Sequence, residues 1–393
     1  MNPATGQILP LPSSTEEQCF LRLVRTHGSP LLLLDTQRLR EQYRGLAQAL
    51  PGVGLHYALK ALPNQNVVGT LVSEGAGFDI ASSGELDLLR LAHVSPRSVI
   101  HTHPVKKQRE ICDALRFGCT SFVYDNAAEL EKFQRYRHRV GLVLRIGFRN
   151  PAAGVDLSQK FGCTPAEVPC LLKRARSLGL RVKGLSFHVG SQCVSPNAHA
   201  TAIRQTLGLI REVKSSGLAR IGLLDIGGGF PVDYGDGVPD IDSFCAPIRS
   251  ALAEAPGHLR VIAEPGRVIA APAMTGVFSV IGKTVREDQP WYYLDDGVYG
   301  SFSGRVFERA SYPIRVFSHG PLRASVLAGP TCDSIDIIAE GIPLPELQVG
   351  DLVIAGMMGA YTAASATDFN SLPRTPILSA DDVARGEFYG NAS

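Results

Sequence analysis

The segment Val53-Gly-Leu-His-Tyr-Ala-Leu-Lys60 is a short, mostly apolar run that ends on a charged side chain. A polar turn and a helix-length segment follow it, and the pattern recurs up to about residue 267. Near-apolar strands that alternate with helices are typical of a parallel sheet covered by helices, and eight such units favour a closed (β/α)8, TIM-like barrel. The predicted strands are Val53–Lys60, Gly77–Ala81, Ser98–His103, Ser121–Tyr124, Gly141–Ile146, Gly184–Val189, Gly222–Ile226 and Arg260–Glu264.

The segments between these strands include plausible helices. Pro165–Ser177 and Ala200–Ser216 have apolar residues at helical spacing. Ser82 and Glu85 have the spacing of a capping box ahead of a leucine-rich run, which predicts the start of another helix.

The pattern changes after Arg267, where short apolar runs follow one another without long helices between them. This predicts a second, antiparallel β domain, to which Pro30–Asp35 can add a strand. The domains are therefore expected at 1–35 (a segment of the β domain), 36–270 (the barrel) and 271–393 (the β domain). The predicted β-domain strands are Met274–Val285, Trp291–Leu294, Pro313–Phe317, Ala324–Leu327, Leu352–Ile354 and Thr375–Leu378.

Composition excludes several classes of protein. The 393 residues carry a formal net charge of +2, and basic residues come in short pairs such as Lys106-Lys107, so nothing points to nucleic acid or another polyanionic partner. Met1–Pro12 lacks the features of a secretory signal, and the apolar cluster Leu31–Leu34 is too short to span a bilayer. The eight scattered cysteines favour reduced thiols in the cytoplasm over disulfides or a zinc site.

Polar residues gather where the predicted barrel strands end, which is where the active sites of such barrels lie. Taken singly, each has an ordinary explanation: a lysine can snorkel to the surface, a histidine can be a satisfied core residue, and glycines can form a turn. Their common position at one end of one barrel favours a functional site. These residues are Lys60, Asp79, His103, Arg145, His188, Gly227, Gly228, Gly229, Glu264 and Arg267.

The residue types fit a single cofactor. A glycine triplet lets backbone N–H groups approach a phosphate, and a nearby arginine adds positive charge. A poorly hydrated lysine can form a Schiff base with an aldehyde. A carboxylate such as Glu264 can keep a pyridine nitrogen protonated, and a histidine can supply a flat face for an aromatic ring. Together these groups predict a site for pyridoxal 5′-phosphate (PLP).

At this point the sequence resembles the ornithine decarboxylase-like family of fold-type III PLP enzymes, over about Pro30 to Leu378. The barrel of that family is followed by an alanine racemase-like β domain, as expected here. The motifs that carry the resemblance are Tyr57-Ala58-Leu59-Lys60, Gly77-Phe78-Asp79-Ile80-Ala81-Ser82, Leu144-Arg145-Ile146, Lys160-Phe161-Gly162, Ser186-Phe187-His188-Val189-Gly190-Ser191, Asp225-Ile226-Gly227-Gly228-Gly229-Phe230, Glu264-Pro265-Gly266-Arg267, Asp296-Gly297-Val298-Tyr299-Gly300-Ser301-Phe302, Gly329-Pro330-Thr331-Cys332-Asp333 and Met358-Gly359-Ala360-Tyr361-Thr362.

The resemblance implies a role for each matching residue. Lys60 is expected to bond covalently to the cofactor, Glu264 to contact the pyridine nitrogen, and His188 to stack on the ring. Asp79 and Arg145 match supporting positions around the cofactor. The expected phosphate-binding residues are Ser191, Gly227, Gly228, Gly229, Arg267 and Tyr361.

The resemblance further implies a homodimer whose active sites are shared across the interface. Cys332 and Asp333 match a pair that the neighbouring subunit contributes, with the cysteine handling protonation of the carbon that loses carbon dioxide. Asp333 and Asp296 are expected to bind the distal amine of the substrate. Without its neighbours, Cys332 has the simpler explanation of a small buried hydrophobe.

The implied reaction is decarboxylation of a basic L-amino acid, first L-ornithine to putrescine in polyamine biosynthesis. Lysine or another diamino acid is the alternative, because one methylene is worth only about 1–3 kcal/mol of discrimination. Cys332-Asp333 differs from the Cys-Glu of diaminopimelate decarboxylases. Less favoured are a PLP racemase and a non-catalytic regulatory homologue. Asp295, where relatives have asparagine, is either solvent-facing or able to alter chain-length preference, and His103 has no assigned role beyond lining the barrel mouth.

Overall fold

The computed structural model describes residues 14–150, 153–235 and 237–385. These residues form two compact units. The barrel unit comprises 40–231 and 238–269, and the β unit comprises the described parts of 1–39, 232–237 and 270–393. Within the described residues, no helix is both long enough and apolar enough to cross a membrane.

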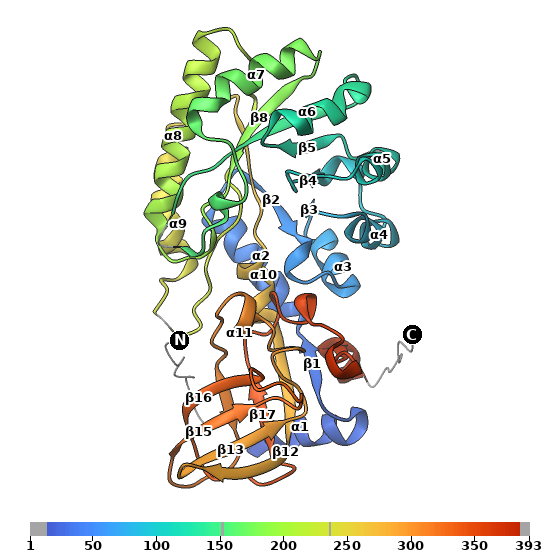
Figure 1. Cartoon of the computed structure of the whole chain (residues 1–393), viewed down its shortest axis with the longest axis vertical. Helices are drawn as coiled ribbons and strands as arrows, with labels where there is room; N and C mark the ends of the chain where they lie inside the picture. Colours follow the sequence, from blue (N-terminus) through green and yellow to red (C-terminus); the bar gives the residue numbers. More distant parts are fainter. Residues whose placement is uncertain (1–13, 151–152, 236, 386–393) are drawn as a thin grey trace. The chain divides into compact units, whose positions relative to one another are not determined.

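The barrel unit is a closed ring of eight parallel strands, as predicted. Helices form a layer outside the strands (Figure 1). The strands are β2 (Val53–Ala58), β3 (Gly77–Ile80), β4 (Val99–His101), β5 (Ser121–Tyr124), β6 (Gly141–Ile146), β8 (Val182–Phe187), β10 (Leu223–Asp225) and β11 (Arg260–Ala263). The helices are α2 (Thr36–Ala49), α3 (Gln65–Ser73), α4 (Ser83–Leu91), α5 (Gln108–Phe117), α6 (Ala127–Phe133), α7 (Val168–Ser177), α8 (Pro196–Ser215), α9 (Ile241–Leu252) and α10 (Arg267–Ala270).

The sequence explains why these elements form. The interior of the barrel includes a cluster of aliphatic side chains contributed by five strands, namely Ile100, Val123, Val143, Leu223 and Ile262. Helix α4 begins as the capping box predicts, because the Ser82 hydroxyl accepts from the Glu85 backbone N–H at 3.3 Å. Its residues Leu86 and Leu89 are buried, as expected for the apolar face of a helix that packs on a sheet.

Two details of the barrel unit differ from the sequence prediction. Strand β2 ends at Ala58, two residues before the predicted end, and Lys60 lies in a single 3-10 turn, Leu59–Ala61. A small antiparallel pair, β7 (Ala153–Val155) with β9 (Ser191–Cys193), was not predicted. Three-residue strands give too short a run for periodicity to detect.

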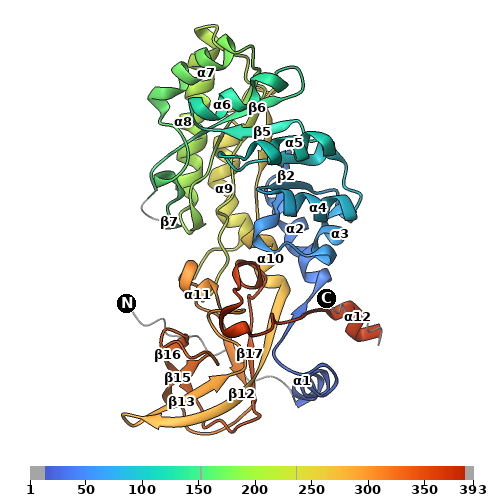
Figure 2. The same ribbon diagram turned by 45° about the vertical axis from the view of Figure 1, so that its right-hand side comes forward.

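The β unit is a mainly antiparallel sheet in which β12 and β13 form a hairpin (Figure 2). β1 joins it beside β12, in the segment predicted from Pro30–Asp35. Two pairs are parallel, β13 with β15 and β1 with β18, which alternation patterns could not show. The strands are β1 (Leu31–Leu34), β12 (Met274–Arg286), β13 (Gln289–Leu294), β14 (Ile314–Val316), β15 (Arg323–Ala328), β16 (Ile337–Leu344), β17 (Leu352–Ala355) and β18 (Ile377–Ser379).

Strand β16 was missed in the sequence. Its run Ile337-Ile-Ala-Glu-Gly-Ile-Pro-Leu344 contains both a glycine and a proline, which are normally signs of a turn. It forms an edge of the main sheet path, where proline is tolerated. The helices of this unit are α1 (Ser14–His27), α11 (Gly304–Phe307) and α12 (Ala380–Arg385).

Candidate active site

Lys60 lies at the carboxyl end of β2, beside the end of its neighbour β3. Its Nζ is 3.2 Å from Oδ2 of Asp79, and the lysine side chain is 40% exposed whereas Asp79 is 2% exposed. The strand register pairs Ala58 with Asp79, so the barrel itself sets this contact. The other oxygen of Asp79 accepts a hydrogen bond from the Thr102 hydroxyl at the end of β4. The carboxylate is thus fixed while the lysine remains reachable.

Two carboxyl groups meet at the ends of the neighbouring strands β10 and β11. The carboxyl groups of Asp225 and Glu264 interact inside the barrel, and their mutual repulsion when both are ionised favours a proton on one of them. Burial and the charge of Glu264's acidic neighbours Asp225 and Asp79 hold the pKa of Glu264 well above its ordinary value. Burial raises the pKa of Asp225 to about 6. This pair can store a proton inside the barrel.

Asp225 was quoted in the glycine motif but not predicted as a site residue. Its Oδ1 accepts from the Gly227 backbone N–H at 2.9 Å, so it also shapes the turn after β10. The available signal was an aspartate at the end of an apolar strand, directly before the glycines. Its pairing with Glu264 could not be deduced without knowing that β10 and β11 are neighbours.

The turn after β10 has room only for glycine. A Cβ on Gly228 would lie 2.5 Å from the Glu264 carbonyl oxygen and 3.1 Å from Nε2 of His188. Gly229 has φ +95°, and a Cβ there would lie 2.3 Å from the Gly190 carbonyl oxygen. The backbone is therefore bare at this position, as a close approach to a phosphate requires.

A buried arginine is associated with a second loop of the barrel unit. Arg267, 5% exposed, donates from Nη2 to the Ser191 hydroxyl at 3.0 Å. Ser191 begins β9, whose Cys193 N–H donates to the Gly229 carbonyl at 3.0 Å. The serine, the arginine and the glycine turn are thus linked within one unit, and together they can bind an anion.

His188 is held as a neutral ring. Its Nδ1 accepts from the Gly190 backbone N–H at 3.0 Å. Burial, with the nearby positive charges of Arg145 and Lys60, lowers the pKa of His188 well below its ordinary value.

The guanidinium of Arg145 lies 5.4 Å from the centre of the Phe161 ring, and His103 contacts the same ring edge-on at 5.5 Å. His103 therefore packs on an aromatic residue of the mouth.

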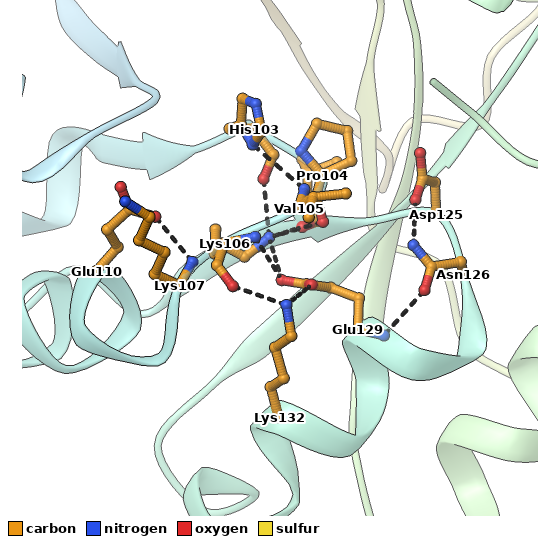
Figure 3. Close-up of polar contacts among 11 residues, drawn as sticks. His103, Pro104, Val105, Lys106, Lys107, Glu110, Asp125, Asn126, Glu129 and Lys132 are labelled. Carbon is orange, nitrogen blue, oxygen red and sulfur yellow. Dashed lines mark hydrogen bonds and ion pairs between the residues drawn. The ribbon is translucent and has the colours of Figure 1, made fainter. Parts of the chain in front are cut away.

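Lys106, the first residue of the basic pair Lys106-Lys107, is buried at 1% exposure. Its Nζ is 3.0 Å from Glu129, which also binds Lys132 at 2.6 Å (Figure 3). Burial lowers the pKa of Lys106 to about 8. The ammonium group also donates to the backbone carbonyls of His103, Pro104 and Val123. Lys106 therefore ties the loop after β4 to β5 and α6.

These groups of the barrel unit fit PLP. The bare glycine turn with Arg267 and Ser191 suits the phosphate, the Glu264–Asp225 pair can present a carboxyl group to the pyridine nitrogen, and Lys60 is an accessible amine. The roles predicted for Asp79, Arg145 and His188 stay predictions about their contact with the cofactor.

The predicted substrate-binding residues lie on adjoining loops of the β unit. The Tyr299 hydroxyl donates to Oδ2 of Asp333, and Asn370 donates from Nδ2 to Sγ of Cys332 at 3.4 Å. The hydrogen bond from Tyr299 lowers the pKa of Asp333, which stays ionised. Buried Asp336 accepts from the backbone N–H groups of Val298 and Thr331, and so joins the two loops. Tyr299, Asn370 and Asp336 were not predicted.

Asp296 and Asp295 have different hydrogen-bond partners. Asp296 is buried and accepts from the backbone N–H groups of Gly297 and Ser301 and from the Thr375 hydroxyl. Burial raises the pKa of Asp296. Asp295 accepts from the Ser279 N–H at 2.9 Å and is half-buried. An effect of Asp295 on chain-length preference stays a prediction. Tyr361, which was predicted to bind the phosphate, lies in the β unit, and its backbone adopts φ +55°.

The fold and this set of side chains define a pyridoxal-dependent barrel enzyme. The model of the pyridoxal binding domain of pyridoxal-dependent decarboxylases matches residues 36–271. The chain belongs to this family, and it is a PLP-dependent decarboxylase.

Individual relatives are similar over nearly the whole chain. A lysine/ornithine decarboxylase of Selenomonas ruminantium is 36% identical over 92% of each chain. The crystal structure of a lysine/ornithine decarboxylase from Vibrio vulnificus, complexed with cadaverine, is 50% identical with a TM-score of 0.90, covering 94% of this chain and 99% of that one. A structure of SrLDC with PLP and cadaverine is 34% identical, with a TM-score of 0.89 over 95% and 96% of the two chains.

Proposed function

We propose that this decarboxylase acts on L-ornithine, giving putrescine, with L-lysine as the next-best substrate. The observation that carries the proposal is Asp333, an ionised carboxylate on the loop that also bears Cys332. An ammonium group leaving water needs such a carboxylate partner, and an aspartate suits the end of a diamino acid. The named relatives, which act on lysine and ornithine, support a basic amino acid as substrate.

Each residue then has a definite task. Bound PLP supplies an electron sink for the negative charge left when carbon dioxide departs. Glu264, backed by Asp225, holds a proton at its carboxyl group for the pyridine nitrogen. His188 supplies a neutral ring that adds no charge beside that nitrogen. Cys332 delivers a proton to the carbon that lost carbon dioxide, and Asp333 with Asp296 orients the distal ammonium.

We also propose that the enzyme is a homodimer in which Cys332 and Asp333 act at Lys60 of the partner subunit. Apolar side chains around Cys332 support this assignment. Ile335 is 56% exposed and Leu372 is 41% exposed, and Phe369, 36% exposed, stacks on Tyr299 at 4.3 Å. Exposed apolar side chains on the segments that surround a site are typical of a subunit interface.

A cytoplasmic location accords with the chemistry. All eight cysteines are free thiols in the structure. Exposed Cys19, Cys170 and Cys332 would be open to oxidation outside a reducing compartment. Fractionation of cells that express the protein tests this part of the proposal.

Product analysis tests the function directly. The holoenzyme is incubated separately with L-ornithine, L-lysine, L-arginine and meso-diaminopimelate, and the amines and carbon dioxide are measured. We expect putrescine from ornithine at the highest kcat/KM, and cadaverine from lysine within about 200-fold of it. A preference for meso-diaminopimelate or arginine would overturn the substrate assignment. The matched variant is Asp333→Asn, which we expect to raise KM for ornithine.

A further inference from the structure

A cavity lies at the amino ends of the barrel strands, opposite the carboxyl ends where Lys60 lies. It has a volume of about 730 Å³ and is formed where β8, β10 and β11 begin, together with α8. Six cationic side chains line it, namely Arg181, Lys183, Arg211, Lys214, Arg220 and Arg260. His258 also lines the cavity, and its lining contains neither aspartate nor glutamate.

These cations are not neutralised by the protein. Among the residues that the structure describes, none of the six takes part in an ion pair, whereas arginines elsewhere in the barrel unit do, such as Arg44 with Glu74 and Arg249 with Asp242. Lys183 shows the consequence: burial and the positive charges of Arg260 and Arg181 lower its pKa. Like charges held together without a counter-ion destabilise the folded chain.

The six cations of the cavity stand out against the small net charge of the whole chain. The whole chain has a formal net charge of +2, yet one cavity holds six uncompensated cations. A concave surface with one sign of charge focuses its field and concentrates ions of the opposite sign. The six residues come from four separate segments of the sequence, so they do not form a basic stripe that the sequence alone could reveal.

The cavity also has an apolar wall. Ile210, Ile221 and Leu223 are 5%, 5% and 8% exposed, and they line the cavity together with Pro256. An inorganic ion gains nothing from contact with apolar side chains, whereas an organic anion can pack a ring or chain against them.

We propose that this cavity is a binding site for a small polyphosphate anion, such as a nucleoside triphosphate. Arginine forks and lysine ammonium groups bind phosphate oxygens, and six of them match the several charges of a polyphosphate. The apolar wall would accommodate the base. The site is distinct from the glycine turn after β10, because it lies at the other ends of the strands.

Calorimetric titration of the holoenzyme tests this proposal. Loading with PLP fills the phosphate-binding turn and removes it as a competitor. ATP and inorganic tripolyphosphate are titrated separately, without divalent metal. We expect one equivalent of either to bind, more weakly as salt is raised, and ATP to bind more tightly because of the wall.

Matched variants locate the binding. Arg181 and Arg220 are exposed and make no side-chain hydrogen bond in the described residues, so Arg181→Ala/Arg220→Ala should fold and bind at least about tenfold more weakly. Arg135→Ala/Lys173→Ala removes the same charge from exposed sites outside the cavity and should bind as the wild type does. Absence of binding, or equal loss in both double variants, would overturn the proposal. Decarboxylase activity is not needed for either result.

Discussion

A lysine reacts with an aldehyde only through its neutral amine, so burial and contacts decide which lysine can do so. The barrel unit offers more than one candidate. Lys106 has a pKa lowered to about 8, but its ammonium group is enclosed by carbonyl oxygens and Glu129. Lys60 is 40% exposed and lies in the turn directly after β2, beside Asp79. Access, rather than pKa, therefore favours Lys60 as the reactive lysine and gives Lys106 a structural role.

Lys106→Met should lower the free energy of unfolding by about 3 kcal/mol, because it leaves the buried Glu129 carboxylate with Lys132 as its one remaining ion-pair partner among the described residues. Urea denaturation measures this change. The adjacent Lys107→Met is the control; its side chain is exposed, and a change below about 0.5 kcal/mol is expected. Equal effects of the two substitutions would contradict the role of Lys106.

The Asp225–Glu264 pair predicts a pH-dependent stability. Asp225 releases its proton near pH 6 when folded and near pH 3.8 when unfolded, so the folded state binds more protons between these values. Stability contributed by this group is therefore lost as pH rises from about 4 to 6. In the cofactor-free protein, Asp225→Asn should raise the free energy of unfolding by about 1–3 kcal/mol at pH 8 and by much less at pH 4.5. A difference that does not change with pH would count against the shared proton.

At the scale of elements, the sequence predicted most of what periodicity encodes. All eight barrel strands and the strand from Pro30–Asp35 were found, because each is an apolar run bounded by turns. What it could not supply was pairing: the contact of Asp225 with Glu264 and the parallel pairing of β13 with β15 depend on which strands are neighbours. The interrupted β16 and the three-residue β7 and β9 carry too little pattern.

We expect cofactor binding to depend strongly on the turn after β10. Gly228→Ala places a methyl group 2.5 Å from the Glu264 carbonyl, so the turn must shift. We expect PLP affinity, measured by titration of the cofactor-free protein, to fall at least about tenfold, with cooperative unfolding retained. Gly222→Ala is the control, because a methyl group there meets nothing within 4 Å. Unchanged affinity in Gly228→Ala would argue against this turn as the phosphate site.

For the whole molecule, the proposed dimer combines residues of the two units in one active site. Lys60 belongs to the barrel unit and Cys332 to the β unit. The sequence located both residues through motifs, but their assembly across subunits stays a prediction.

Mixing inactive variants tests that assembly. Lys60→Ala and Cys332→Ala chains are co-expressed or exchanged, and heterodimer formation is confirmed by native mass spectrometry. One intact site per heterodimer should restore about a quarter of wild-type activity, because half of the dimers are mixed and each has one competent site. No recovery in confirmed heterodimers would show that each site is built from a single chain.

The identity of the reactive lysine is the claim on which the rest depends. The holoenzyme is reduced with sodium borohydride, which fixes the cofactor to its lysine, and the peptides are mapped by mass spectrometry. We expect one modified peptide, carrying the cofactor on Lys60, and none in Lys60→Ala. Modification at Lys106 or Lys183, the buried lysines with lowered pKa values, would contradict it.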